Sequence, residues 1–300
     1  MKVVVMIEGL PKQRLHRLKK GLARLDELYK RAKPKDPEVV IRRKAAAKRR
    51  EGLLKATDGK MRVCLICMTP RSGSTFFSEA LRVTEQLGNP GEWFNAHDTR
   101  SIDQIIERYG CQSREDILDH IYNYSASDNG ICVIKGDYFQ CLPFLFDGLF
   151  ESHYDQVKFV FLTREDLLAQ AISRYVGTIT GSWSSSQKAS GETVEYDRIG
   201  IEKQLTFLLD MEEGWRNLFA SRGIRPARMT YEQLTRNLSG KVEQISKIMN
   251  VPLAVDMNPE DLSLKKQGSS RNKDWAKQYM DETRKAAKAM QKLDKAKAKA

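Results

Sequence analysis

The chain lacks any apolar run that approaches the roughly 18–20 residues of a membrane-spanning helix. Its opening stretch, Met1–Ile7, is too short for a secretory signal peptide and no small-residue cleavage site follows it. Cysteine is scarce: an odd total of 5 in 300 residues argues against a disulfide framework and against a zinc site. We therefore expect a cytoplasmic protein, with peripheral attachment to a membrane as the alternative.

Acidic residues are in the minority, and the net charge is +12. The excess belongs to the two ends: residues 1–60 contain 19 Lys and Arg against 7 Asp and Glu, and residues 276–300 contain 8 against 3. The middle of the chain is slightly acidic, so it lacks the basic footprint of a nucleic-acid-binding domain. We expect a basic extension over 1–59, one domain over 60–275 and a Lys/Ala-rich tail over 276–300.

Leucines recur every three or four residues between positions 12 and 33, which predicts an amphipathic helix that Pro34 and Pro37 end. Residues 41–55 favour a second basic helix. We expect this helical extension to pack its apolar stripe on the domain or on a partner. A coiled-coil or assembly arm, and attraction to an anionic surface such as a membrane or RNA, are the alternatives.

Buried strands alternate with amphipathic helices through the rest of the chain. The predicted strands lie near 63–66, 130–134, 157–162 and 226–231. This alternation predicts an α/β fold, a three-layer sandwich with a central, mainly parallel sheet. Cys64, Cys67, Cys132 and Cys141 lie in apolar surroundings, so we expect buried thiols.

A tight loop, Thr69-Pro-Arg-Ser-Gly-Ser-Thr75, follows the first strand and leads into a helix. Unpaired backbone N–H groups converge at a helix N-terminus and favour an anion there. The loop is not a nucleotide-triphosphate P-loop, which needs a lysine after the second glycine and a metal-binding hydroxyl next to it. Here Arg71 stands before Gly73, which disfavours a nucleotide-dependent kinase and suits a phosphate-like group held without a metal.

This loop resembles the 5′-phosphosulfate loop of sulfotransferases that use 3′-phosphoadenosine-5′-phosphosulfate (PAPS), which have a P-loop-like fold. The closer resemblance is to bacterial carbohydrate sulfotransferases of the trehalose 2-sulfotransferase-like family, which share the arginine and a following Pro-x-Glu-aromatic-Phe segment, here Pro90–Phe94. The resemblance implies that the loop binds the donor through Arg71, Ser72, Gly73, Ser74 and Thr75.

Two further residues would act at the reacting atoms. The resemblance puts the general base on Glu92, and the neighbouring aromatic rings are expected to desolvate its carboxylate. His97 is the alternative base. Lys135 ends the second strand, where a cation faces the ligand crevice and can stabilise charge on the sulfuryl group.

The remaining cofactor positions follow the third strand and the C-terminal loop. Arg164 and Ser173 are similar to the 3′-phosphate element of PAPS enzymes, an arginine after a strand and a serine on the next helix. Lys266, Gln267 and Arg271 lie in a basic loop similar to the family's C-terminal cofactor segment, with Trp275 as its anchor.

The resemblance implies sulfuryl transfer from PAPS to a hydroxyl of a carbohydrate or glycolipid, by in-line displacement and without a metal. A non-catalytic protein that binds PAPS or its product, or an assembly protein with basic arms, is the main alternative. A homodimer is compatible with the family. Neither the acceptor nor the role of the basic ends follows from the sequence.

Overall fold

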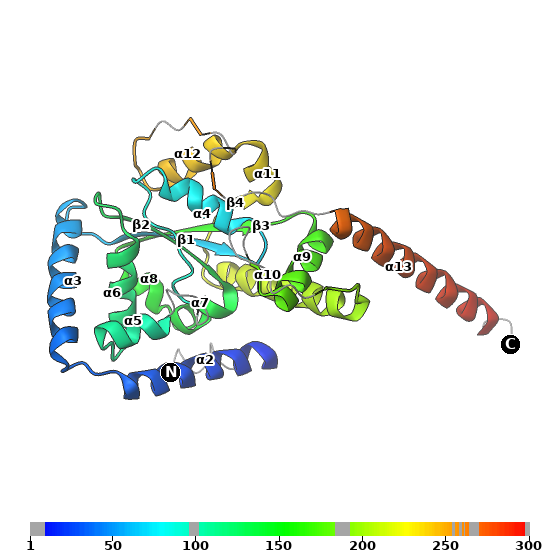
Figure 1. Ribbon diagram of the computed structural model, residues 1–300, viewed down its shortest axis with the longest axis horizontal. Coiled ribbons are helices and arrows are strands. Elements are labelled where there is room, and N and C mark those ends of the chain that lie inside the picture. The colour runs from blue at the N-terminus through cyan, green and yellow to red at the C-terminus, as the bar shows by residue number, and fades with distance from the viewer. Residues whose placement is uncertain are drawn as a thin grey trace. The chain divides into compact units, whose positions relative to one another are not determined.

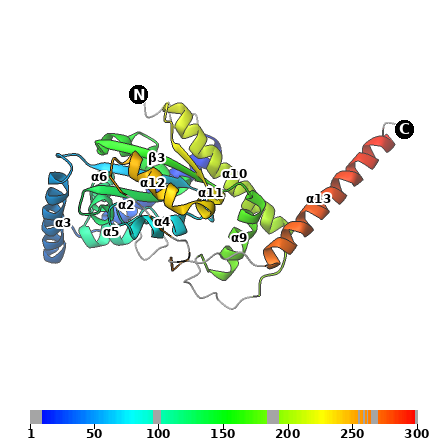
Figure 2. The ribbon, with the colours of Figure 1, turned by 90° about the horizontal axis from the view of Figure 1, so that it is seen from above.

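The computed structural model describes residues 10–95, 102–183, 193–253, 256–257, 260, 262–263 and 270–297. Contacts within the chain divide it into two compact units. Unit 1 contains Met1–Thr163 and Met211–Ser263, and unit 2 contains Arg164–Asp210 and Leu264–Ala300. Figure 1 and Figure 2 show the helices and strands of both units. His97, Lys266 and Gln267 lie outside the described residues.

Unit 1 is built on a parallel sheet of four strands in the order β2-β1-β3-β4. The strands are β1 (Arg62–Met68), β2 (Ile131–Asp137), β3 (Gln156–Thr163) and β4 (Ala227–Thr230). This confirms the predicted α/β fold with a central parallel sheet. The chain runs from β1 outward to β2 and then crosses back to β3, so the connections change direction at the carboxyl ends of β1 and β3. Open α/β sheets bind ligands at such a point.

Helices cover both faces of this sheet (Figure 1). On one face lie α4 (Ser74–Arg82), α11 (Tyr231–Arg236) and α12 (Leu238–Ile248), and their apolar side chains form a core with strand residues such as Ile66 and Val133. On the other face lie α6 (Arg114–Ser125), α7 (Tyr138–Leu145) and α8 (Leu149–His153).

Residues Val63–Met68 of β1 are all buried, as expected for a strand covered on both faces. Within β1, Cys64 and Cys67 have the C-x-x-C spacing of zinc and redox sites. Side chains alternate along a strand, so residues three apart project to opposite faces. Cys64 belongs to the core on the α4 face, and Cys67 projects to the other face. The pair therefore does not form a joint site.

The basic extension folds as α2 (Lys12–Arg31) and α3 (Pro37–Lys55), and both helices pack within unit 1. Helix α2 contacts α7 and α5 (Ile102–Tyr109), while α3 contacts α5 and α6. Three of the leucines of the predicted stripe, Leu18, Leu25 and Leu28, are buried. The amphipathic stripe is therefore covered by the chain's own helices.

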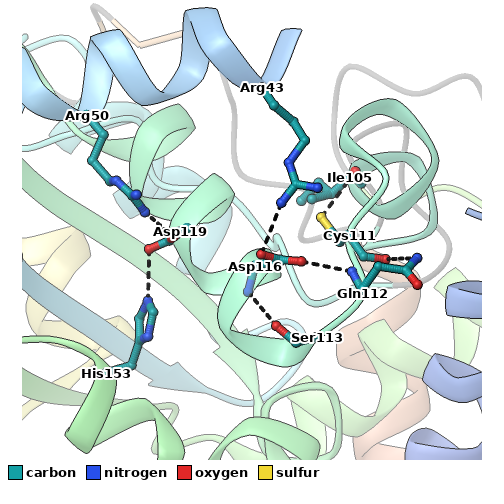
Figure 3. A network of polar contacts seen from close by, with 9 residues as sticks. All are labelled: Arg43, Arg50, Ile105, Cys111, Gln112, Ser113, Asp116, Asp119 and His153. Atoms are coloured by element: carbon teal, nitrogen blue, oxygen red, sulfur yellow. Dashed lines mark hydrogen bonds and ion pairs between the residues drawn. The ribbon is translucent and has the colours of Figure 1, made fainter. Parts of the chain in front are cut away.

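Arginines of α3 dock this helix on α6 (Figure 3). Arg50 pairs with Asp119, which also pairs with His153 Nε2 at 3.1 Å, and Arg43 lies 3.5 Å from Asp116. Burial alone would raise the pKa of Asp119, but the hydrogen bonds from His153 and Arg50 lower it. Part of the positive charge of the extension thus serves contacts inside unit 1.

Unit 2 has its own small core. It contains α9 (Leu167–Thr180), the first part of α10 (Arg198–Ser221) and α13 (Ser270–Lys297). Ile172, Ile201, Leu208 and Trp275 are among its buried residues. Helix α13 runs without a break past position 275, where the sequence analysis began a separate tail. Over the described stretches, no helix combines the length and apolarity needed to cross a membrane.

The buried cysteines lead to a chemical prediction. Burial raises the pKa of the Cys64 and Cys111 thiols to about 12 and raises the pKa of Cys67, Cys132 and Cys141. Only the thiolate is an efficient nucleophile, so at pH 8 the folded protein should resist iodoacetamide at all 5 cysteines. Mass spectrometry after alkylation with and without urea measures this, and rapid labelling of Cys64 in the folded protein would contradict the burial described here.

Candidate active site

The loop between β1 and α4 makes a tight turn with two residues in the left-handed region. Arg71 has φ 68° and Gly73 has φ 82°, while Ser72 N–H donates to the Thr69 carbonyl at 3.2 Å. Glycine adopts such a φ at little energetic cost, whereas the same φ strains the backbone of an arginine. This turn places Gly73 as the N-cap of α4, at the carboxyl end of β1.

The N-terminus of α4 has the features of an anion site. Gly73 has no side chain, so the N-cap residue itself makes no side-chain cap bond to the N–H groups of the first helical turn. The hydroxyl of Ser72 is buried and has no hydrogen-bond partner among the residues that the structure describes. A ligand that supplies the missing hydrogen-bond partner would account for such a buried polar atom. Both features therefore fit a phosphate or sulfate group at this turn.

Tyr231 packs directly against this turn. A Cβ added to Gly73 would lie 2.5 Å from Tyr231 Cδ2, which is far inside van der Waals contact. Tyr231 is the first residue of α11 and follows β4. Both the backbone conformation and the available space thus require glycine at position 73.

A buried ammonium group joins this loop to Glu92. Lys135 Nζ donates to Thr75 Oγ1 at 2.9 Å and pairs with Glu92 Oε1 at 3.1 Å, and only 5% of the lysine side chain is exposed. The backbone is tied at the same place, since Lys135 N–H donates to the Gly91 carbonyl at 3.2 Å. The structure therefore brings together three of the predicted site residues, one from each of three separate segments.

The second carboxylate oxygen of Glu92 also has polar neighbours. Glu92 Oε2 lies 3.4 Å from Asn95 Nδ2 and 3.5 Å from Gln140 Nε2. The two aromatic residues that follow Glu92 pack on other rings. Trp93 stacks on Tyr124 with ring centroids 5.5 Å apart, and Phe94 packs on Phe144 with ring centroids 4.8 Å apart. The carboxylate therefore has polar donors beside it, and both neighbouring aromatic rings are buried.

Gln140 is a site residue that the sequence analysis missed. It lies in the first turn of α7, where Asp137 and Gln140 form a capping box: Asp137 Oδ1 accepts from Gln140 N–H at 2.9 Å, and Gln140 Oε1 accepts from Asp137 N–H at 3.3 Å. The same amide group directs its Nε2 toward Glu92. An Asp-x-x-Gln sequence at the end of a strand was the signal for this turn.

The predicted 3′-phosphate residues belong to unit 2. Arg164 follows the last residue of β3, Ser173 lies on α9, and Arg271 on α13 holds its guanidinium 5.2 Å from the ring centroid of Trp275. Trp275 is buried in the core of unit 2, consistent with its predicted anchoring role. Within the described part of the chain, no three His, Cys, Asp or Glu residues gather as metal ligands.

The sequence model of the Stf0 sulphotransferase family matches residues 63–128 and 147–282, more than half of the chain. The chain belongs to the Stf0 sulphotransferase family. Trehalose 2-sulfotransferase of Mycobacterium tuberculosis is 25% identical over 259 residues, with 74% of this chain and 96% of that protein covered. The enzyme of the same name from Mycolicibacterium smegmatis is 24% identical over 253 residues, with 72% and 93% covered.

Family membership supports a transferase that moves sulfate from a donor. The anion loop and Glu92 lie in the matched residues, whereas Lys135 and Gln140 lie in the stretch between 128 and 147 that the family match omits. The family match therefore does not bear on the ammonium group that joins the two loops.

Two glycines allow a controlled test of the anion loop. Gly73 and Gly148 are both helix N-caps with φ 82° and nearly equal ψ, but a Cβ at Gly148 would meet nothing within 4 Å. Gly148→Ala should cost about 1 kcal/mol of unfolding free energy from backbone strain. Gly73→Ala should cost roughly 3 kcal/mol because the clash with Tyr231 is added. Urea unfolding measures both, and equal losses would contradict the packing described for Gly73.

Proposed function

We propose that this sulfotransferase takes a sulfuryl group from PAPS and transfers it to a hydroxyl of a carbohydrate or glycolipid, with Glu92 as general base. The observation that carries this proposal is the position of Lys135 Nζ, in contact with both Thr75 of the anion loop and Glu92. A cation placed between a phosphate-binding loop and a carboxylate is suited to a reaction in which negative charge moves from an attacking oxygen to a leaving phosphate.

The donor's phosphosulfate would be held by the anion loop. The N–H groups at the start of α4 and the hydroxyls of Ser72, Ser74 and Thr75 would donate to its oxygens, and Arg71 would add charge. Ser72 supports this assignment because its buried hydroxyl is unsatisfied within the described structure. The 3′-phosphate would be bound by Arg164 and Ser173, with Lys266, Gln267 and Arg271 on the adenosine side, as the family resemblance implies.

Glu92 would accept the proton of the acceptor hydroxyl as that oxygen bonds to sulfur. The bond between sulfur and the bridging phosphate oxygen then breaks, and its electron pair stays on the phosphate. Lys135 would stabilise this growing charge, since its ammonium is buried and already adjacent to the loop. Gln140 and Asn95 would keep the carboxylate oriented through Oε2. No step in this scheme requires a metal.

A carbohydrate acceptor is favoured by the relatives. Both are named for sulfation of trehalose, a sugar with no charged group, and this chain covers more than 90% of each. A carboxylate base that removes a proton from a neutral hydroxyl suits such a substrate. We therefore expect uncharged sugar hydroxyls, free or at the head of a glycolipid.

The test is transfer of labelled sulfate from PAPS to a panel of sugars and glycolipids. Glu92→Gln should lower kcat by at least about 100-fold because the base is lost while the side chain keeps its size. Arg164→Ala should weaken donor binding by about tenfold or more because a charged hydrogen-bond donor to phosphate is removed.

Glu107→Gln is the matched control, because this residue is exposed on α5 and outside the site. It should retain wild-type transfer. Wild-type protein that binds PAPS but labels no acceptor would favour the non-catalytic alternative. Transfer that survives Glu92→Gln unchanged would remove Glu92 as the base.

A further inference from the structure

We propose that helix α2 of the basic extension is a working part of the catalytic site: it fixes the first turn of α7, and Gln140 in that turn positions Glu92. The sequence alone left the role of this extension open. This inference rests on the proposed role of Glu92. In this scheme Arg14 and Gln140 are positioning residues, and neither is required to touch a substrate.

Helix α2 contacts α7 at three successive turns. Arg14 is 1% exposed, pairs with Glu213 at 3.2 Å, and lies over the Tyr138 ring at 5.7 Å from its centroid. One turn later, Arg17 lies 4.2 Å from the ring centroid of Phe139. At the next turn the helices approach closely, since a Cβ on Gly21 would lie 2.9 Å from Pro143 Cγ.

The α7 residues that α2 contacts immediately precede the residue that contacts the Glu92 carboxylate. Tyr138, Phe139 and Gln140 are the first three residues of α7, so the two rings under the arginines immediately precede the amide that contacts Glu92 Oε2. The capping box holds Gln140 to the end of β2, so a shift of this turn moves its Nε2. At 3.5 Å this contact is already long, and a small displacement would break it.

A second connection runs from Tyr138 to the anion loop. Tyr138 packs edge-on against Trp215, with ring centroids 5.4 Å apart. Trp215 is fully buried, and its Nε1 donates to the Met68 carbonyl at 3.1 Å, at the last residue of β1 before the loop. Trp215 is held to β1 by this bond of its own, so the anion loop keeps its support when Arg14 is changed.

The family match covers neither of these two helices. The match to the Stf0 family begins at residue 63 and omits the stretch between 128 and 147. Helix α2 lies before the first limit and α7 lies inside the omitted stretch, and these two segments pack against one another. Arg14 is a buried cation, which is costly unless its partners are part of the design of the fold. We therefore infer that α2 and α7 act together on the site.

Arg14→Gln tests the connection, and Arg24→Gln is its matched control. Arg24 is on the same helix but pairs with Asp103 on α5 at 2.5 Å. In the sulfate-transfer assay, Arg14→Gln should lower kcat by about tenfold or more while the KM for PAPS stays within about twofold, because misplacing a base slows the chemical step. Arg24→Gln should leave both constants near wild type.

The effect should pass through Gln140. Gln140→Leu should lower kcat similarly, and adding Arg14→Gln to it should produce little further loss, because the two changes disable one connection. Additive losses would contradict the coupling. Arg14→Lys, which keeps the charge opposite Glu213, should restore part of the rate.

Hydrogen exchange gives a readout that does not depend on activity. In Arg14→Gln, peptides that cover Tyr138–Leu145 should exchange faster, with no such change in Arg24→Gln or in the Ser74–Arg82 helix. Unchanged exchange in α7 would overturn the inference whether or not the protein transfers sulfate. Absence of transfer by wild type, together with faster exchange in α7, would instead overturn the proposed function and keep the structural coupling.

Discussion

The ammonium of Lys135 is the contact on which the site depends. It is buried near the carboxyl end of β2 and has two oxygen partners, Thr75 Oγ1 at 2.9 Å and Glu92 Oε1 at 3.1 Å. A buried cation without partners would be strongly unfavourable, so both loops are held to the strand end by the need to satisfy it. The result is a helix N-terminus with glycine as its N-cap and a carboxylate fixed at one edge of the sheet.

The fold makes this arrangement possible. Parallel strands end at a common edge, and β1 lies between β2 and β3, so segments far apart in the sequence converge there. The helix layer beneath supports the edge through Trp215, whose indole bonds the end of β1. The extension continues this support from outside the family's usual boundaries, through Arg14 and Tyr138. The site is thus held in place from β1, β2 and α7 together.

Local patterns were enough to predict the strands, the anion loop and the helix after it, because strand burial and turn formation depend on residues that are adjacent in the sequence. They were not enough for Gln140, whose role depends on a contact with a loop 48 residues away. The polar neighbours of Glu92 were not predicted either, since no local pattern places Asn95 and Gln140 at its carboxylate. The leucine stripe predicted that α2 packs on something, but not that it packs on α7, because the two segments are more than 100 residues apart in the sequence.

The most direct measurement is calorimetric titration of adenosine 3′,5′-bisphosphate, the desulfated donor, into wild type, Lys135→Met and Glu92→Gln. The account predicts that wild type binds, that Lys135→Met binds about tenfold or more weakly because a buried cation beside the anion loop is lost, and that Glu92→Gln binds at least as well as wild type. Failure of wild type to bind would contradict the assignment of the loop. Equal weakening in both variants would place Glu92 on the donor side and remove it as the base.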